Sequence, residues 1–165
     1  MKIGVPKEIK SQENRIGLTP ESVKILTSNG NEVMVENNGG FEAGFYNEQY
    51  KSAGAKIIDK AEDIFNDSEI IVKVKEPQPS EVKMIKENQI VFTYLHLAAA
   101  KELTKGLVDS KSVCIAYETV TDNNGRLPLL APMSAVAGRM SVQAGAHCLE
   151  KNQKGRGLLL GGAPG

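Results

Sequence analysis

The sequence is poor in cysteine and has no excess of charge of either sign. Its two cysteines, Cys114 and Cys148, stand far apart in the 165 residues. They fit neither a disulfide framework nor a four-ligand zinc site, so we expect reduced thiols and no metal. Twenty Lys and Arg balance twenty Asp and Glu, and bulk charge therefore gives no reason to expect nucleic acid as a partner.

Long apolar runs are also missing. No window approaches the ~18 apolar residues of a membrane span, and the residues after Met1-Lys2 contain no apolar segment typical of a signal peptide. We therefore expect a cytoplasmic protein with no membrane partner.

Short β-branched runs alternate instead with helical stretches. Strands are predicted at 3–5, 33–35, 56–58, 70–74, 89–95 and 112–117. Helices are predicted at 20–29, 47–53, 61–66, 81–86, 98–108 and 132–151. Several strands are nearly continuous apolar runs, which is typical of strands covered by helices on both faces. This rhythm predicts an α/β fold with an open, largely parallel sheet.

Capping residues predict where some helices begin and end. Thr19 before Pro20 is a suitable N-cap, and Gly30 is a suitable terminator of the same helix. Ser80 is expected to cap the helix 81–86. The composition changes only at the glycine-rich end, where no strand-to-helix Gly-x-Gly-x-x-Gly is present. We therefore divide the chain into a domain at 1–151 and a glycine-rich linker at 152–165.

Three polar residues follow predicted strands, at the edge where open α/β sheets collect ligands. Arg15 can bind a carboxylate through two parallel hydrogen bonds, Lys75 can bind a carbonyl or carboxylate, and His96 can transfer protons near neutral pH. They can converge if their strands are parallel neighbours. Each also has an ordinary alternative: an exposed loop arginine, a solvated lysine or one paired with Glu76, and a structural histidine. Lys73 is expected to have no special role.

Four motifs resemble one known family. They are MKIGVPKEIK with NRIGLTP at 1–20, IVKVKEP at 71–77, FTYLHLA at 92–98, and LAPMS with AGRM at 130–140. In this order and spacing they resemble the N-terminal catalytic domain of the alanine dehydrogenase and pyridine nucleotide transhydrogenase family, over essentially the whole chain. The resemblance implies an α/β fold with an open, largely parallel Rossmann-like (flavodoxin-like) sheet and helices on both faces.

The resemblance also implies a reaction. Alanine dehydrogenases oxidise L-alanine with NAD and water to pyruvate, ammonium and NADH, reversibly. By resemblance, Arg15 and Lys75 bind the substrate, His96 is the acid/base group with Lys75 beside it in catalysis, and Ser134 and Met133 approach the nicotinamide of NAD. The expected partners are the small-molecule substrate, L-alanine or pyruvate, and further copies of the chain in a homo-oligomer.

The chain departs from the family at its end. In the family the glycine-rich segment leads into a separate NAD-binding Rossmann domain, whereas here 152–165 ends the sequence. We therefore expect a truncated oxidoreductase that is inactive alone. Two alternatives stay open: the N-terminal domain of a transhydrogenase α-subunit, and a non-enzymatic remnant acting as an assembly module. The presence of both Lys75 and His96 in their motifs favours the dehydrogenase.

Overall fold

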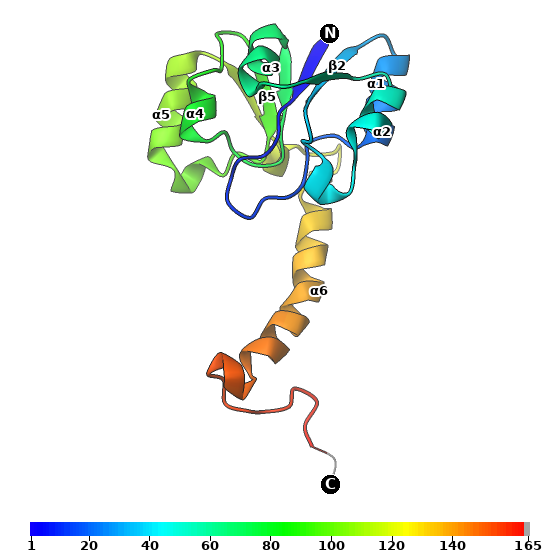
Figure 1. The fold of residues 1–165 in the computed structure, drawn as a ribbon. Coiled ribbons are helices and arrows are strands. Elements are labelled where there is room, and N and C mark those ends of the chain that lie inside the picture. Colours follow the sequence, from blue (N-terminus) through cyan, green and yellow to red (C-terminus); the bar gives the residue numbers. More distant parts are fainter. Residues whose placement is uncertain (164–165) are drawn as a thin grey trace. The chain divides into compact units, whose positions relative to one another are not determined.

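The chain folds into two compact units in the computed structural model, which describes residues 1–163 (Figure 1). The first unit is Met1–Thr119, and the second begins at Val120. The first unit contains a six-stranded sheet, and the second contains one long helix. The predicted division into a domain at 1–151 and a linker at 152–165 stays a prediction.

The sheet of the first unit is open and entirely parallel. Its strands are β1 (Lys2–Val5), β2 (Glu32–Glu36), β3 (Lys56–Ile58), β4 (Ile70–Val72), β5 (Ile90–Thr93) and β6 (Val113–Ala116). Their order is β3-β2-β1-β4-β5-β6, and every neighbouring pair is parallel. This is the strand order of Rossmann-type sheets, in which the chain winds outward in both directions from the centre. The predicted fold class is confirmed.

Helices cover both faces of this sheet, because apolar side chains from each strand point alternately to two separate cores. The helices are α1 (Pro20–Ser28), α2 (Asn47–Ser52), α3 (Ala61–Asp67), α4 (Pro79–Val82) and α5 (Lys101–Ser110). One core receives Val23 from α1 and Tyr50 from α2, and the other receives Phe65 from α3 together with side chains of α5. The consecutive residues Ile71 and Val72 of β4 contribute to opposite cores.

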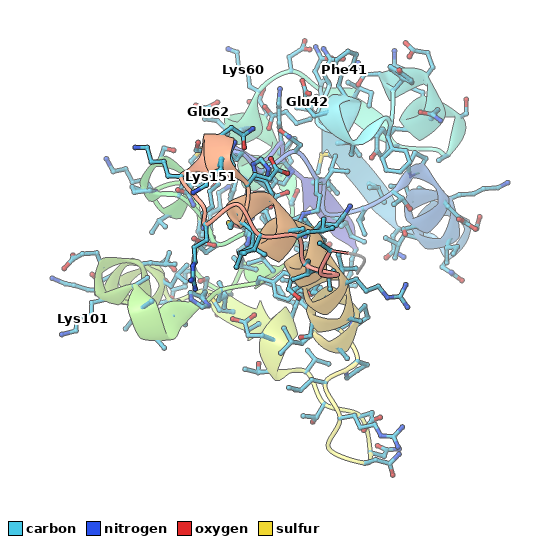
Figure 2. The ribbon with its side chains drawn as sticks, turned by 90° about the horizontal axis from the view of Figure 1, so that it is seen from below. Phe41, Glu42, Lys60, Glu62, Lys101 and Lys151 are labelled. Atoms are coloured by element: carbon cyan, nitrogen blue, oxygen red, sulfur yellow. The ribbon has the colours of Figure 1, made fainter. Side chains whose placement is uncertain are left out.

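Short 3-10 turns complete the chain path at η1 (Phe41–Ala43), η2 (Leu97–Ala99), η3 (Tyr117–Thr119) and η4 (Lys151–Gln153). Figure 2 shows the side chains, among them Phe41 and Glu42 on η1 and Lys101 at the first residue of α5. The 3-10 turn η2 occupies the start of the helix predicted at 98–108, and α5 itself begins at Lys101.

The first helix begins and ends as its capping residues predict. The Thr19 hydroxyl accepts a hydrogen bond from the backbone N–H of Ser22 at 3.3 Å, and Pro20 is the first helical residue. Gly30 has a φ of 82°, a left-handed conformation that glycine adopts without a Cβ clash. Local sequence is sufficient here, because both ends depend on residues within one turn of the helix.

The prediction that Ser80 caps a helix at 81–86 is wrong. The helix α4 begins at Pro79, ends at Val82, and has Gln78 as its N-cap. The Glu81 carboxylate accepts the backbone N–H of Gln78 at 2.7 Å, which closes a reciprocal cap around Pro79. Proline at the first helical position and an acidic residue two positions later fix the start one residue before Ser80.

Strand and helix ends also differ by a few residues from the predictions. The strand predicted at 70–74 pairs as β4 only to Val72, and the strand predicted at 89–95 ends as β5 at Thr93. These shorter strands leave Lys75 and His96 on loops beyond the ends of β4 and β5.

The main element of the second unit is the helix α6 (Ala131–Cys148). It ends three residues before 151, where the helix was predicted to end. No residue of α6 is buried, and apolar side chains such as Val136 and Met140 are more than half exposed, at 55% and 59%. Cys148 is an exposed free thiol, and Cys114 in β6 is a partly buried one. Among the helices of residues 1–163, none is both long and apolar enough to cross a membrane.

Candidate active site

The candidate site lies at the centre of the sheet, where the winding direction reverses. The strands β1 and β4 are neighbours, but the chain continues from β1 toward β2 on one side and from β4 toward β5 on the other. A crevice forms at such a switch point beyond the carboxyl ends of the strands, and ligands of open α/β sheets bind there. Arg15 lies in the loop after β1, and Lys75 lies in the loop after β4. His96 follows β5, the next strand along the same edge.

The Arg15 guanidinium is oriented by a neighbouring carboxylate. Its Nε and Nη2 donate to Glu13 Oε1 at 2.8 Å and to Oε2 at 2.6 Å, and the Arg15 backbone N–H also donates to Oε1 at 2.9 Å. These bonds from Arg15, helped by the charge of Lys75, lower the pKa of Glu13 from its ordinary 4.5 to about 2. The Glu13 side chain is only 7% exposed, whereas that of Arg15 is 44% exposed. Arg15 is therefore a fixed cation that still faces solvent.

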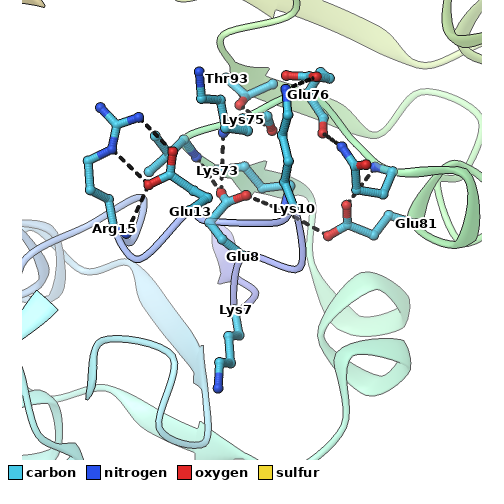
Figure 3. Close-up of polar contacts among 12 residues, drawn as sticks. Lys7, Glu8, Lys10, Glu13, Arg15, Lys73, Lys75, Glu76, Glu81 and Thr93 are labelled. Carbon is cyan, nitrogen blue, oxygen red and sulfur yellow. Dashed lines mark hydrogen bonds and ion pairs between the residues drawn. The ribbon is translucent and has the colours of Figure 1, made fainter. Parts of the chain in front are cut away.

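Lys75 is held through its backbone while its ammonium group is left unpaired. Its N–H donates to Glu8 Oε1 at 3.3 Å, and its carbonyl accepts the Thr93 hydroxyl at 2.9 Å (Figure 3). Within residues 1–163 the Lys75 ammonium makes no hydrogen bond or ion pair. Glu76, its suggested partner, instead pairs with Lys10. This leaves a half-buried positive charge beside the Glu13–Arg15 pair.

Lys73 is fully buried, which overturns the expectation that it has no special role. Its ammonium lies 2.7 Å from Glu81 Oε1 and 3.1 Å from Glu8 Oε2, and all three side chains are at most 2% exposed (Figure 3). A buried lysine needs such partners, because desolvating an unpaired charge is costly. The signal in the sequence was a lysine between valines in a strand that is covered on both faces.

His96 has an unusual backbone conformation, with a φ of 51° and a ψ of 41°. Left-handed backbone is uncommon for residues other than glycine and is found at functional sites. The Glu118 carboxylate accepts the backbone N–H of His96 at 2.7 Å and that of Leu95 at 3.2 Å. The His96 side chain is exposed, and it makes no hydrogen bond within the described residues.

A hollow of about 320 Å³ adjoins His96. Its wall is mostly apolar, and it is lined by Leu95, His96, Leu97, Ala98, Ala116, Glu118 and Thr119. Sequence reasoning did not single out Glu118, although it lies two residues after the end of β6, at the same edge of the sheet as the three candidates.

Two tyrosines extend the site toward β5 and β6. The Tyr117 ring packs edge-on against Phe92 and Tyr94, with ring centroids 4.3 Å and 4.9 Å apart. Burial raises the pKa of Tyr117, so its hydroxyl stays protonated at neutral pH. The pKa of Arg15 is raised chiefly by Glu13, and Tyr94 adds to this, which places Tyr94 in the electrostatic surroundings of Arg15. Sequence reasoning used Tyr94 only as part of a motif.

The two proposed nicotinamide contacts belong to the second unit. Met133 and Ser134 lie in the first turn of α6, where Met133 is 38% exposed and the Ser134 hydroxyl donates to the Leu130 carbonyl at 3.4 Å. Their role toward a cofactor stays a prediction. Across the described residues no group of three or more His, Cys, Asp or Glu side chains is placed to hold a metal ion.

The fold and the residues at the carboxyl ends of the strands define a class of protein. It is an α/β domain with two cations at the switch point of its sheet and a histidine beyond the next strand. A family model described as the N-terminal domain of alanine dehydrogenase/PNT matches residues 4–137. The alanine dehydrogenases of Halomonas elongata and Bacillus subtilis are 54% and 53% identical to the chain over all 165 residues. The chain therefore belongs to the alanine dehydrogenase/pyridine nucleotide transhydrogenase family, as its motifs predicted.

Solved structures agree with this assignment. An L-alanine dehydrogenase has a TM-score of 0.90 and 53% identity, and the match covers 99% of this chain and 45% of that one. A transhydrogenase from Sinorhizobium meliloti has a TM-score of 0.70 and 24% identity over 75% of this chain and 35% of its own, a likeness of fold alone. The chain spans 44% and 43% of the length of the Halomonas and Bacillus proteins.

Proposed function

We propose that this chain carries the substrate-binding and acid/base residues of an NAD-dependent alanine dehydrogenase, which interconverts L-alanine with pyruvate and ammonium. The observation that carries the proposal is the pair of cations Arg15 and Lys75 on the two sides of the switch point. Relatives that are 53–54% identical and named alanine dehydrogenase support it. The transhydrogenase alternative is not favoured, and no observation favours an assembly module.

The geometry of the site supports a role for each of these residues. Arg15, held by Glu13, binds the substrate carboxylate, and the unpaired ammonium of Lys75 binds the oxygen or nitrogen on the adjacent carbon. Two cations that contact neighbouring groups of the substrate orient that carbon for reaction, which is a positioning contribution to the rate. Loss of hydride leaves a C=N bond on the substrate, and water hydrolyses that bond to the ketone and ammonium. His96, solvent-exposed on the neighbouring loop, moves protons to and from the water and the nitrogen in this step.

When bound, NAD would supply the acceptor for the hydride that leaves the substrate carbon. Residues 1–165 contain no Gly-x-Gly-x-x-Gly turn to hold its pyrophosphate. We therefore propose that Ser134 and Met133 contact only the nicotinamide half and that residues outside this chain hold the rest.

We also propose that the protein self-associates in the cytoplasm. The exposed apolar side chains of α6, among them Val136 and Met140, form a surface that a second copy could cover. Free thiols at Cys114 and Cys148 suit a reducing compartment. Sedimentation of the chain over a range of concentrations tests the association, and a monomer throughout would contradict it.

A chimera tests the function directly. Residues 1–165 are joined to the remaining part of the Halomonas elongata alanine dehydrogenase, and alanine-dependent NADH formation is measured. We expect activity that His96→Ala reduces by about 10²-fold or more. His147→Ala is the matched control, because His147 is the only other histidine and its side chain is 60% exposed. Activity that survives His96→Ala unchanged would overturn the assigned role.

A further inference from the structure

The segment that carries Lys75 lacks one of its strand neighbours. β4 ends at Val72, but its extension still bonds to β5: the Lys73 N–H donates to the Phe92 carbonyl at 3.1 Å, and the Val74 carbonyl accepts the Tyr94 N–H at 3.2 Å. On the other side β1 ends at Val5, before Pro6. The pairing of β1 with β4 joins Ile3 to Ile70 and Gly4 to Ile71, so β1 supplies no acceptor for the N–H of Val74.

A side chain takes the place of the missing strand. Glu8, in the loop after β1, accepts the N–H of Val74 at 2.6 Å and the N–H of Lys75 at 3.3 Å through the same oxygen, Oε1. Its second oxygen, Oε2, holds the Lys73 ammonium at 3.1 Å. One carboxylate therefore contacts three consecutive residues, the last of which is the candidate substrate-binding lysine (Figure 3).

We propose that Glu8 is a positioning residue that fixes Lys75 relative to Arg15. The inference rests on the proposed function of those two cations in binding the substrate. Glu8 and Arg15 belong to the same loop, so the bonds from Glu8 to residues 73–75 tie the Arg15 loop to the Lys75 loop across the switch point.

A close backbone contact supports the same link. A Cβ added to Gly17 would lie 2.6 Å from the Val72 carbonyl oxygen and 3.2 Å from the Lys73 Cα, which is backbone that cannot move aside. The Arg15 loop is therefore pressed against the end of β4 at Gly17 and bonded to the extension of β4 at Glu8. Arg15 lies between these two attachments.

The buried Lys73 places a positive charge beside the Glu8 carboxylate in the interior. The Glu8 side chain is 2% exposed, and a carboxylate so placed needs a counter-charge and hydrogen-bond donors. Lys73 supplies the charge, and the two backbone N–H groups supply the donors. The Glu81 carboxylate accepts the same ammonium at 2.7 Å, but within residues 1–163 it accepts no N–H from Val74 or Lys75. Glu81 is thus the natural control for Glu8.

The experiment compares Glu8→Leu, Glu8→Gln and Glu81→Leu in the 165-residue chain. Stability is measured by urea unfolding, pyruvate affinity by NMR titration, and the hydrogen exchange of the Val74 and Lys75 amides by NMR. We expect both leucine variants to unfold at lower urea. Only Glu8→Leu should weaken pyruvate binding, by about tenfold, and speed exchange at Val74 and Lys75. Compared with Glu8→Leu, Glu8→Gln should retain much of the pyruvate affinity and of the slow amide exchange, because its amide oxygen can still accept the two N–H groups.

Each outcome decides the proposal. Equal weakening of pyruvate binding by Glu8→Leu and Glu81→Leu, or unchanged amide exchange in Glu8→Leu, would overturn it. If Glu8→Leu does not fold, Glu8→Gln is compared with Glu81→Gln by NMR. Val74 and Lys75 amide resonances that shift in Glu8→Gln but not in Glu81→Gln support the role of Glu8. Amide resonances that shift equally in the two variants, or in neither, refute it. Failure of the unmodified chain to bind pyruvate would count against the proposed function, while the amide measurements would still test the positioning.

Discussion

The backbone N–H of His96 donates to the Glu118 carboxylate at 2.7 Å, and it does so from a left-handed conformation with a φ of 51°. The same carboxylate accepts the N–H of Leu95. A side chain that follows β6 thus holds the turn that follows β5 in a conformation that a histidine rarely adopts. This relationship gives the loop a strain that can be measured.

Replacing His96 should expose that strain. A left-handed residue other than glycine loses about 1 kcal/mol or more relative to glycine. We expect His96→Gly to be more stable to urea than His96→Ala by about 1 kcal/mol, and both to lose the acid/base group. At positions with ordinary backbone angles a glycine variant is less stable than an alanine variant, because glycine gains more conformational entropy on unfolding. A lower urea midpoint for glycine than for alanine would show that the left-handed turn is not retained in solution.

The 165-residue chain should bind pyruvate weakly without cofactor. Two charge-assisted contacts that are partly solvated suggest a dissociation constant of roughly millimolar or weaker. Arg15→Ala and Lys75→Ala should each weaken binding in an NMR titration, and His96→Ala should affect it less. Lys56→Ala is the matched control. Lys56 is the first residue of β3, at the amino end of that strand and so away from the candidate site, and it pairs with Glu32. Perturbed resonances that map away from Arg15, Lys75 and His96 would show that these side chains do not form one site.

The same chain should form no NADH from L-alanine and NAD. The reaction needs cofactor and substrate held against each other, and loss of that positioning removes a large part of the rate. The chain carries no dinucleotide fingerprint and spans 44% of the length of the Halomonas relative. The assay follows absorbance of NADH with purified chain, and turnover above that of the His96→Ala variant would disprove the prediction.

Glu13→Gln should change the response of stability to acid. The pKa of Glu13 is lowered from 4.5 to about 2 by its bonds from Arg15, so the folded state binds this proton less tightly than the unfolded state. The pair therefore stabilises the fold above about pH 4.5, and its contribution falls as the pH drops toward 2. Because Arg15 is 44% exposed, we expect no more than about 1 kcal/mol. Urea unfolding of both proteins from pH 6 to pH 3 should show a difference that shrinks below pH 4.5; a constant difference would contradict the assignment.

Lys73→Met should be among the most destabilising single substitutions in the sheet. It leaves Glu8 and Glu81 buried without their shared cation, and breaking a buried ion network in this way costs about 3–5 kcal/mol. Urea unfolding at pH 7 measures the loss. The triple variant Lys73→Met, Glu8→Gln, Glu81→Gln should recover a large part of it, because no uncompensated charge stays buried. A loss below about 1 kcal/mol for Lys73→Met would show that these groups are hydrated in solution.

Much of the fold could be predicted because the signals for its elements are local. Thr19, Pro20 and Gly30 bound α1 through contacts within one turn, and the apolar runs at 33–35 and 70–74 reflect strands covered on both faces. The start of α4 was missed because Ser80 is a preferred N-cap residue by type and Gln78 is not. The choice between them depends on Glu81, whose carboxylate serves the cap and Lys73 together.

The sequence by itself determined the alternation of strands and helices, the family motifs, and the three polar residues Arg15, Lys75 and His96 beyond strand ends, since each of these is written in neighbouring residues. Only the tertiary structure decided what surrounds them. Glu8 lies 65 residues from Lys73, and Glu118 lies 22 residues from His96. Such contacts depend on which strands become neighbours, and a lysine between two valines has the same local sequence whether its charge is buried against two carboxylates or reaches water.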